Sequence, residues 1–444
     1  MADTTVVREL HARVVDQLSA WREGEEAAGR TPTLADQRAY TAALIQAELD
    51  RHARAQVDAG DNPPGGEEEQ ELGRTVQAML FGLGPLEALL ADPDIENIDY
   101  NGCDAGWLQY ADGTTTPAPP LWPGDDALVS FIQMIGARDG HAPRRFDLAQ
   151  PRLNLRLPDG SRLFAIMDVS HRPCLSIRRH RLVRVFLQQL IELGAIDVGL
   201  AEFLRALVKA RKNVIIAGGT GVGKTTMLRA LLNEIPAEER LVTIENAFEL
   251  GLHEPGLSDL HPRVVALEAR EANVEGQGEL PMAELVKAGL RLNPSRVIVG
   301  EVLGDEIVSM LEAMSQGNDG SMGTIHATSS AYVWRRMAMY AAKSAMRLPA
   351  EVTYQMIDGA IDFVVFIGMR DERALGGQLH RFVASVREVT GAEGQQVITN
   401  EVYRPGPTGR AVPVAGALRC LQDLELVGFD PSWLESPAGW WEPR

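Results

Sequence analysis

The chain is poor in cysteine and has no long apolar run. Only three cysteines occur among its 444 residues, at positions 103, 174 and 420, and none of them belongs to a C-x-x-C pair. This usage excludes a four-cysteine zinc site and a disulfide framework, so we expect a reducing cytoplasm. No apolar stretch approaches the roughly 18 residues that a membrane span requires, so any membrane contact is expected to be peripheral.

Basic residues are also scarce relative to acidic ones. Lys and Arg number 43 against 61 Asp and Glu, which gives a formal net charge of −18. A duplex-binding protein usually presents a basic face, so this balance argues against nucleic acid as the main partner. The first eight residues lack the basic-then-apolar pattern of a secretory signal, which also favours a cytoplasmic location.

Breaker residues and periodic segments divide the chain into three predicted parts. Residues 1–69 are expected to form a helical extension that ends in a linker, because residues 60–70 are rich in Gly, Pro and Glu. Residues 70–185 combine short strand patterns with a helix at 125–137, which predicts an α+β domain. Residues 186–444 alternate strands and helices and then close with β segments, as in a parallel α/β sheet. For the extension, a partner-docking arm and a plain helical hairpin both remain open.

The clearest motif is a phosphate-binding P-loop. Residues 218–225 fit G-x-x-x-x-G-K-[ST], between an apolar strand pattern at 213–217 and a helical pattern at 225–232. Glycines let successive backbone N–H groups face phosphate oxygens, Lys224 would reach the β- and γ-phosphates, and the Thr225 hydroxyl would bind Mg²⁺. The residues expected to bind nucleotide in this segment are Gly218, Gly219, Thr220, Gly221, Val222, Gly223, Lys224, Thr225 and Thr226.

Three further strand patterns end in residues suited to phosphate chemistry. Glu301 follows a buried strand at 296–300 and is placed to hold Mg²⁺ through water or to orient the attacking water. Glu245 ends the strand pattern at 241–245, and His326 ends the one at 322–326, where an imidazole could sense the γ-phosphate. A solvated turn residue and a structural histidine are the plainer interpretations of these positions.

Two arginines are candidates for stabilising charge in the transition state. Arg263 and Arg270 lie in a loop-rich region after the strand at 241–245. An arginine supplied to the γ-phosphate, often by a neighbouring subunit, stabilises the charge that develops there. Taken alone, each is better interpreted as a surface arginine.

Together these motifs resemble the secretion traffic ATPases of type II and type IV systems. The branch that the chain resembles most is that of the Tad (tight-adherence, Flp-type) pilus ATPases. The resemblance covers about residues 70–435. It includes residues 83–93, 157–162, 176–179, the P-loop, 268–276, 293–301 and 316–327.

The resemblance implies a fold and a set of roles. It implies a hexameric ring of subunits in which a PAS-like N-terminal domain joins a RecA-like motor. Glu245 falls in the family's Asp box, Glu301 in Walker B and His326 in the His box, and the arginine-bearing segment contains Arg263 and Arg270. Nucleotide would lie between the two domains, where Arg178 or Arg179 would close over it.

The resemblance also implies a function. It predicts an ATP- and Mg²⁺-dependent motor that lies on the inner face of the cell membrane, acts on a polytopic inner-membrane protein and powers Tad/Flp-type pilus assembly or type II secretion. A type IV secretion or conjugation ATPase is the first alternative. The other two are a nucleic-acid motor on a RecA-like core and a nucleotide-gated structural ring that hydrolyses little ATP.

Two positions depart from the family pattern. Asn246 stands where the Asp box usually has an aspartate, and Leu303 stands where an arginine usually follows Walker B. Both departures remove a charge near the nucleotide, whereas Lys224, Thr225 and the glycines of the P-loop are intact. We therefore predict that nucleotide binds and that hydrolysis is slow or depends on a partner.

Overall fold

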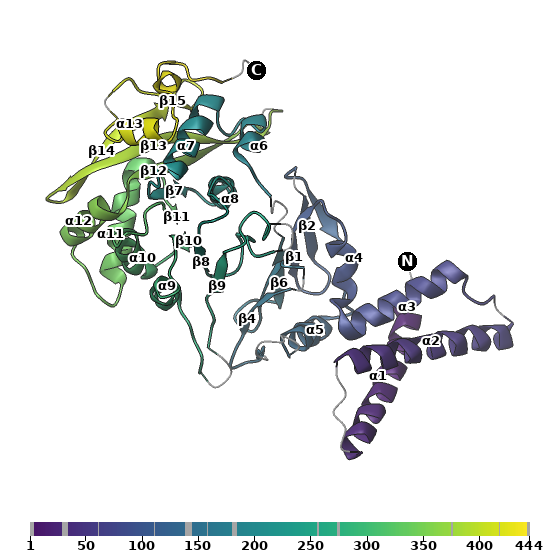
Figure 1. Cartoon of the computed structure of the whole chain (residues 1–444). Coiled ribbons are helices and arrows are strands. Elements are labelled where there is room, and N and C mark those ends of the chain that lie inside the picture. The colour runs from purple at the N-terminus through teal and green to yellow at the C-terminus, as the bar shows by residue number, and fades with distance from the viewer. Residues whose placement is uncertain are drawn as a thin grey trace. The chain divides into compact units, whose positions relative to one another are not determined.

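The structure is a computed structural model that describes residues 4–28, 34–60, 62–110, 112–137, 144–157, 159–179, 184–254, 257–272, 276–373, 376–416 and 418–441. The chain divides into two compact units, residues 1–181 and 182–444. Figure 1 draws both units, and each is described by itself below. Among the described residues, no helix is long and apolar enough to cross a membrane.

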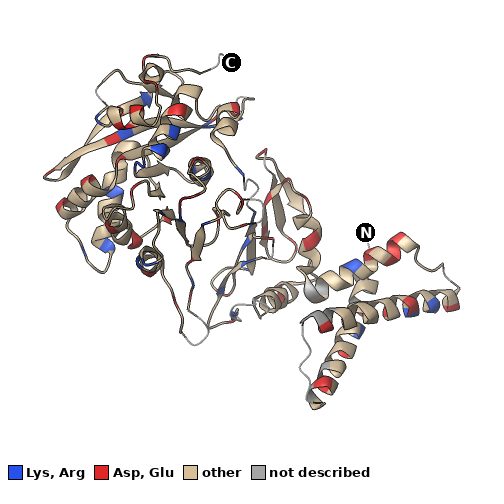
Figure 2. Cartoon of the chain, in the orientation of Figure 1, with Lys and Arg blue, Asp and Glu red and all other residues tan. Residues whose placement is uncertain are grey.

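The first unit begins with a bundle of three helices, α1 (Thr4–Ala27), α2 (Leu34–Ala59) and α3 (Gly66–Phe81). Apolar residues at helical spacing give the bundle a core of its own. This core consists of Val7, Leu10, Val14, Ile45, Leu49, Leu72, Val76 and Leu80. Figure 2 marks acidic and basic residues interspersed along these helices.

The structure corrects the second half of the predicted linker. Residues 66–70 form the first turns of α3 instead of a loop. Glu67, Glu68 and Glu69 lie in the first turn, where negative charge interacts favourably with the helix dipole. The buried side chains of Leu72 and Val76 then hold this helix against α1 and α2.

A six-stranded antiparallel sheet follows in the first unit, in the order β3-β2-β1-β6-β5-β4. The strands are β1 (Ile95–Asn101), β2 (Gly106–Tyr110), β3 (Thr115–Ala118), β4 (Arg152–Arg156), β5 (Arg162–Ile166) and β6 (Cys174–Arg178). The short helices η1 (Gly84–Leu86) and α4 (Glu87–Leu90) precede the sheet, and α5 (Asp125–Ala137) lies between β3 and β4 in the chain. Residues from one face of the sheet form a common core with α5, as the predicted α+β arrangement requires. The edge strand β3 was not predicted, because Thr-Thr-Pro-Ala has no apolar alternation.

The second unit is built on a nine-stranded sheet in the order β15-β14-β13-β12-β7-β11-β10-β8-β9. The strands from β12 to β9 in this order pair in parallel, and β13, β14 and β15 extend the sheet as antiparallel strands. The parallel strands are β7 (Val214–Gly218), β8 (Leu241–Glu245), β9 (Val265–Glu268), β10 (Arg296–Val302), β11 (Met322–His326) and β12 (Phe363–Asp371). The others are β13 (Leu379–Glu393), β14 (Gln396–Pro405) and β15 (Ala411–Pro413).

Helices cover both faces of this sheet. The helices on one face are α6 (Leu187–Glu192), α7 (Val198–Lys209), α8 (Lys224–Leu232) and the C-terminal α13 (Leu421–Leu426). The helices on the other are α9 (Met282–Leu290), α10 (Glu306–Met314), α11 (Val333–Lys343) and α12 (Ala350–Ala360). The remaining short helices are η2 (Ser330–Tyr332) and η4 (Pro431–Leu434).

The central strand β7 shows why a continuous apolar run is needed in such a sheet. Val214 and Ile216 belong to the core on one face, and Ile215 and Ala217 belong to the core on the other. A parallel strand that is buried on both faces is apolar throughout. The parallel strand order β12-β7-β11-β10-β8 and the helices on both faces confirm the predicted α/β fold of the P-loop core. The short strands β9 and β15 were not predicted.

Candidate nucleotide-binding site

Four of the predicted site segments meet at one edge of the large sheet. The P-loop follows β7, His326 ends β11, Glu301 lies near the end of β10, and Glu245 ends β8. Because these strands are parallel and adjacent in the order β7-β11-β10-β8, their carboxyl ends lie along the same edge. Open parallel sheets bind ligands at this edge.

The P-loop has the backbone that a phosphate cradle requires. Gly223 is the N-cap of α8 with φ 96°, and Gly221 has φ 72°, both in the left-handed region that glycine adopts without strain. At Gly218, a Cβ atom would lie 2.7 Å from the Ile367 carbonyl oxygen, so no other residue fits there without a shift. The loop therefore leads directly into a helix N-terminus, where N–H groups and the helix dipole favour an anion.

Lys224, His326 and Glu301 form a continuous chain of contacts. The Lys224 ammonium donates to the Gly219 carbonyl oxygen at 2.8 Å and lies 3.2 and 3.3 Å from the two ring nitrogens of His326. His326 Nε2 lies 2.5 Å from a carboxylate oxygen of Glu301. The structure thus brings the P-loop lysine and the two predicted strand-end groups together, with the imidazole between the other two.

Glu245 is part of the same edge, but its carboxylate is turned toward its own loop. The residue is 2% exposed, and it accepts hydrogen bonds of 2.7 Å from the backbone N–H groups of Glu249 and Leu250. The Thr243 hydroxyl donates to its second oxygen at 3.0 Å. Burial raises the pKa of Glu245 from 4.5 to about 6. In this arrangement Glu245 holds the loop after β8, and its predicted catalytic role remains a prediction.

The raised pKa of Glu245 has a measurable consequence for stability. Because the folded state holds this proton more tightly than the unfolded chain, the carboxyl favours folding below about pH 4.5 and loses that contribution as pH rises through about 6. We compare the free energy of unfolding of Glu245→Gln with that of wild type. As the pH rises from 4 to 7.5, we expect the value for the variant minus the value for wild type to increase by about 2 kcal/mol. Urea denaturation at a series of pH values measures this difference, with Glu279→Gln at an exposed position as the reference. A difference that stays constant across this pH range would contradict the assignment.

Arg381 contacts the P-loop and was missed by the sequence analysis. It lies on β13, and its Nε donates to the Gly221 carbonyl oxygen at 2.8 Å. No motif marks this arginine, because β13 reaches the P-loop only through the pairing of β12 with both β7 and β13. Arg381 is therefore a candidate positioning residue for the tip of the loop.

We expect Arg381→Ala to weaken ATP binding about fivefold, the effect of losing one hydrogen bond worth about 1 kcal/mol. Titration with a fluorescent ATP analogue measures this change. Arg373→Ala is the matched control, since Arg373 pairs with Asp371 at 2.8 Å in the same hairpin. Arg381→Lys keeps a donor and should recover part of the affinity. Equal ATP affinities for Arg381→Ala and wild type would show that Arg381 does not position the P-loop for nucleotide binding.

The structure does not bring Arg263 or Arg270 to the P-loop of the same chain. Arg263 precedes β9 and donates to the Glu238 carbonyl oxygen at 2.7 Å, at the amino ends of the strands. Arg270 follows β9, and its Nε donates to the Gly278 carbonyl oxygen at 2.6 Å. Four strand spacings of about 4.8 Å separate β9 from β7. If either arginine is catalytic, it must act on nucleotide that is bound to another subunit.

Arg178 and Arg179 belong to the first unit. Arg178 is exposed at the end of β6, where the register places it beside Arg162 of β5, which in turn pairs with Arg156 of β4. One face of the sheet therefore carries a row of three arginines. The Arg179 guanidinium donates to the backbone carbonyl oxygen of Ile95 at 3.3 Å. The predicted contact of Arg178 or Arg179 with nucleotide remains a proposal.

The two departures from the family pattern lie at the same edge as the P-loop. Asn246 follows β8 and is exposed. Leu303 follows β10 and is 47% exposed. Neither side chain is needed for the hydrophobic core, so both positions are free to differ in charge without a cost in packing.

Comparisons with known proteins place the chain in a family. The model of the family described as type II/IV secretion system protein matches residues 125–367. A Mycobacterium tuberculosis (strain CDC 1551 / Oshkosh) protein named for conjugal transfer is 35% identical over 272 residues, which are 60% of this chain and 74% of that relative. The type IV secretion system protein PtlH of Bordetella pertussis is 34% identical over 188 residues, 42% of this chain and 52% of that relative.

Solved structures of two ATPases are also similar to the chain. The VirB11 ATPase of the Brucella suis type IV secretion system, in complex with sulphate, has 25% sequence identity and a TM-score of 0.34 over 69% of this chain and 94% of its own. The Legionella pneumophila ATPase DotB has 17% identity and a TM-score of 0.47 over 69% of this chain and 80% of its own. The family assignment rests on the sequence matches. Because the family model covers more than half of the residues, the chain belongs to the type II/IV secretion system protein family and is a P-loop ATPase of that family.

Proposed function

We propose that the chain is the hexameric, Mg²⁺-dependent ATPase that powers a Tad/Flp-type pilus or a related secretion machine at the inner face of the cell membrane. The observation that carries this proposal is the contact chain of Lys224, His326 and Glu301 beside the P-loop. The P-loop lysine and a carboxylate at the end of a neighbouring parallel strand are groups that phosphoryl transfer uses, and the imidazole of His326 lies between them.

The residues present suit a magnesium–triphosphate complex. The glycine backbone and the start of α8 would receive the phosphates, and Thr225 and Glu301 would hold Mg²⁺, the latter through water. The ion would neutralise charge on the β- and γ-phosphates. The ammonium of Lys224 now bonds to Gly219 and His326, and it would exchange these partners for phosphate oxygens.

The exchange of partners by Lys224 would leave the imidazole of His326 beside Glu301. In that position His326 would be placed to detect whether a γ-phosphate is present. Loss of the γ-phosphate after hydrolysis would restore the contact between His326 and Lys224. This gives a physical route from the chemical step to motion of β11 and the segment that follows it. We propose that a polytopic inner-membrane protein receives this motion.

The proposed motor is tested by phosphate release from purified protein across a protein concentration series. We expect a rate per chain that is slow and that rises cooperatively with concentration, because arginines from a second subunit would complete the site. A fast rate that is independent of concentration would contradict both the hexamer and the slowing attributed to Asn246 and Leu303. ATP binding with no phosphate release at any concentration would favour a nucleotide-gated ring.

A type IV secretion or conjugation ATPase is the second candidate, and the names of the relatives favour it. The relatives include proteins named for conjugal transfer and for type IV secretion. Deleting the gene separates the two candidates, because loss of pili with intact DNA or effector transfer supports the pilus motor, and the reverse supports the second candidate. Stimulation of hydrolysis by single-stranded DNA would instead favour a nucleic-acid motor, which the net charge of −18 opposes.

A further inference from the structure

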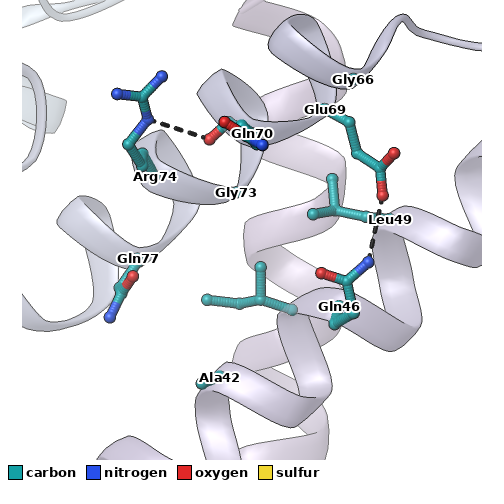
Figure 3. A pocket seen from close by; sticks show the side chains of 10 residues that line it. Ala42, Gln46, Leu49, Gly66, Glu69, Gln70, Gly73, Arg74 and Gln77 are labelled. Atoms are coloured by element: carbon teal, nitrogen blue, oxygen red, sulfur yellow. Dashed lines mark hydrogen bonds between the residues drawn. The ribbon is translucent and has the colours of Figure 1, made fainter.

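The groove between α2 and α3 lies outside the nucleotide site and is bridged by contacts within the chain. It has a volume of about 400 Å³. Gln46 of α2 donates to the Glu69 carboxylate of α3 at 3.2 Å, and a Cβ atom on Gly73 would lie 3.1 Å from Leu49. Figure 3 shows the bond between Gln46 and Glu69 beside Leu49. The groove is therefore a seam of the helix bundle, and a surface with unused charge lies in the second unit instead.

The segment that includes β11 and α11 is basic within an acidic chain. Residues 320–350 contain no Asp or Glu, although acidic residues outnumber basic ones by 61 to 43 in the whole sequence. The basic residues of this segment are Arg335, Arg336, Lys343 and Arg347. Among the described residues, none of these four side chains forms an ion pair. Two of them donate hydrogen bonds, which go to the neutral oxygens of Tyr332 and His326. Their charge is therefore available to a partner.

α11 presents one stripe of side chains to solvent. The stripe begins at the N-cap of the helix and consists of Tyr332, Arg335, Met339 and Lys343. Spacings of three, four and four residues place these exposed side chains on one side of the helix. The buried residues of α11 are Val333, Trp334, Met337, Ala338 and Ala341. Met346 and Arg347, which are also exposed, follow the helix, and together with the stripe they form what we call the α11 surface.

The composition of the α11 surface is typical of an interface with another polypeptide. Arginine, tyrosine and methionine are enriched at protein interfaces, and these three residue types make up most of the surface. A helix that binds a lipid surface inserts its apolar face, but the apolar face of α11 is packed in the core of the second unit. The α11 surface therefore fits an acidic polypeptide segment that also carries apolar side chains.

α11 is bonded directly to the end of the strand that carries His326. Arg336 Nε donates to the His326 carbonyl oxygen at 3.3 Å, and a ring nitrogen of His326 lies 3.2 Å from the Lys224 ammonium. The next residue, Ala327, donates its backbone N–H to the Gly218 carbonyl oxygen at 3.2 Å. A shift of His326 on nucleotide binding would therefore reach α11 through one hydrogen bond.

We propose that the α11 surface binds an acidic segment of a partner polypeptide and passes the motion of β11 to it. Carboxylates of the partner would pair with Arg335 and Lys343, and an apolar side chain would cover Met339 between them. The docking follows from the charge and exposure of the surface, whereas the transfer of motion rests on the proposed function. Each part is therefore tested by its own measurement.

The docking is tested with a fluorescent peptide of repeated Glu-Glu-Leu triplets, added to the full chain without nucleotide. We expect the double variant Arg335→Glu, Lys343→Glu to bind the peptide about tenfold more weakly than wild type, because two attractions become repulsions. The double variant Lys287→Glu, Arg291→Glu is the matched control, since it makes the same change in charge at exposed positions at the C-terminal end of α9. Equal losses in the two double variants, or no binding by wild type, would overturn the proposal.

Two further measurements on the same variants distinguish other occupants of the surface. Wild type that binds phosphatidylglycerol vesicles but not the peptide, with vesicle binding lost in Arg335→Glu, Lys343→Glu, would assign the surface to a membrane. Loss of an ATP-dependent oligomer in that variant, measured by sedimentation velocity, would assign the surface to a second copy of the chain. Either result would overturn the proposal. We expect vesicle binding and oligomer formation to be the same in the two double variants.

The transfer of motion is tested by the effect of nucleotide on peptide affinity. We expect affinities with a non-hydrolysable ATP analogue and with ADP to differ about fivefold, at the lower end of the usual coupling between two sites. Arg336→Met should abolish this difference and keep the binding within about twofold, because it removes the donor to His326. Equal affinities of wild type in the two nucleotide states would overturn the transfer of motion. Absence of phosphate release would instead contradict the proposed motor and leave the docking result intact.

Discussion

Replacing Lys224 with alanine is expected to lower the rate of phosphate release by about three orders of magnitude or more. The lysine is the P-loop cation that would stabilise negative charge on the γ-phosphate. Its ammonium donates to the Gly219 carbonyl oxygen at 2.8 Å, and a phosphate oxygen would replace that acceptor. Its side chain is largely enclosed, at 7% residue exposure, so water would compensate little for its loss. ATP affinity is expected to fall as well, because the lysine would contact the triphosphate in both the ground and transition states.

Lys212→Ala is the matched control for this substitution. Lys212 precedes β7 at the opposite end of the strand and pairs with Asp423 at 2.6 Å, so it lies outside the site. We expect its removal to leave the rate of phosphate release within about twofold, since this ion pair lies at the end of the strand away from the P-loop. Equal losses in the two variants would mean that the effect arises from folding and not from the P-loop.

Replacing Glu301 with glutamine is expected to lower the rate of phosphate release by about two to four orders of magnitude while ATP still binds. The substitution keeps the shape of the side chain and removes the negative charge that, in the proposed mechanism, would hold Mg²⁺ and orient the attacking water. It also weakens the contact with His326, since a neutral amide replaces the carboxylate that lies 2.5 Å from Nε2. The measurements are single-turnover phosphate release and nucleotide affinity on the same preparation.

The result for Glu301→Gln separates it from Lys224→Ala. We expect the glutamine variant to hold ATP without cleaving it, and the alanine variant to lose both properties. Glu312→Gln on α10 serves as the control, because it makes the same chemical change in a helix that packs on one face of the sheet. Unchanged turnover in Glu301→Gln would exclude this carboxylate from the reaction and leave Glu245 as the remaining strand-end acid.

The P-loop and its two flanking elements were predictable from local patterns. A fully buried strand in a parallel sheet must be apolar, and the loop that follows must be rich in glycine to reach phosphate. The same reasoning located β8, β10 and β11 to within a few residues. The second half of the predicted linker was wrong, because packing of Leu72 and Val76 against α1 and α2 extended α3 into a segment whose composition indicates a loop.

The relations between distant residues were less predictable. Sequence patterns placed Glu245, Glu301 and His326 at strand ends, but they did not indicate which carboxylate faces the P-loop. The structure shows that His326 contacts both Lys224 and Glu301, whereas Glu245 is occupied by the backbone of its own loop. Arg381 had no signal at all, because its contact with Gly221 depends on a hairpin whose register is set far along the chain.

The sequence by itself determined the P-loop chemistry, the α/β class of the core and the membership in a family, since each depends on residue types at short, fixed spacings. Tertiary structure alone decided the strand order that places the P-loop beside β11 and β10, the inward turn of Glu245, and the groove between α2 and α3. These features depend on which surfaces pack together. The native packing is the arrangement that minimises exposed apolar area and unpaired polar groups over the whole chain. No short segment of the sequence therefore encodes it.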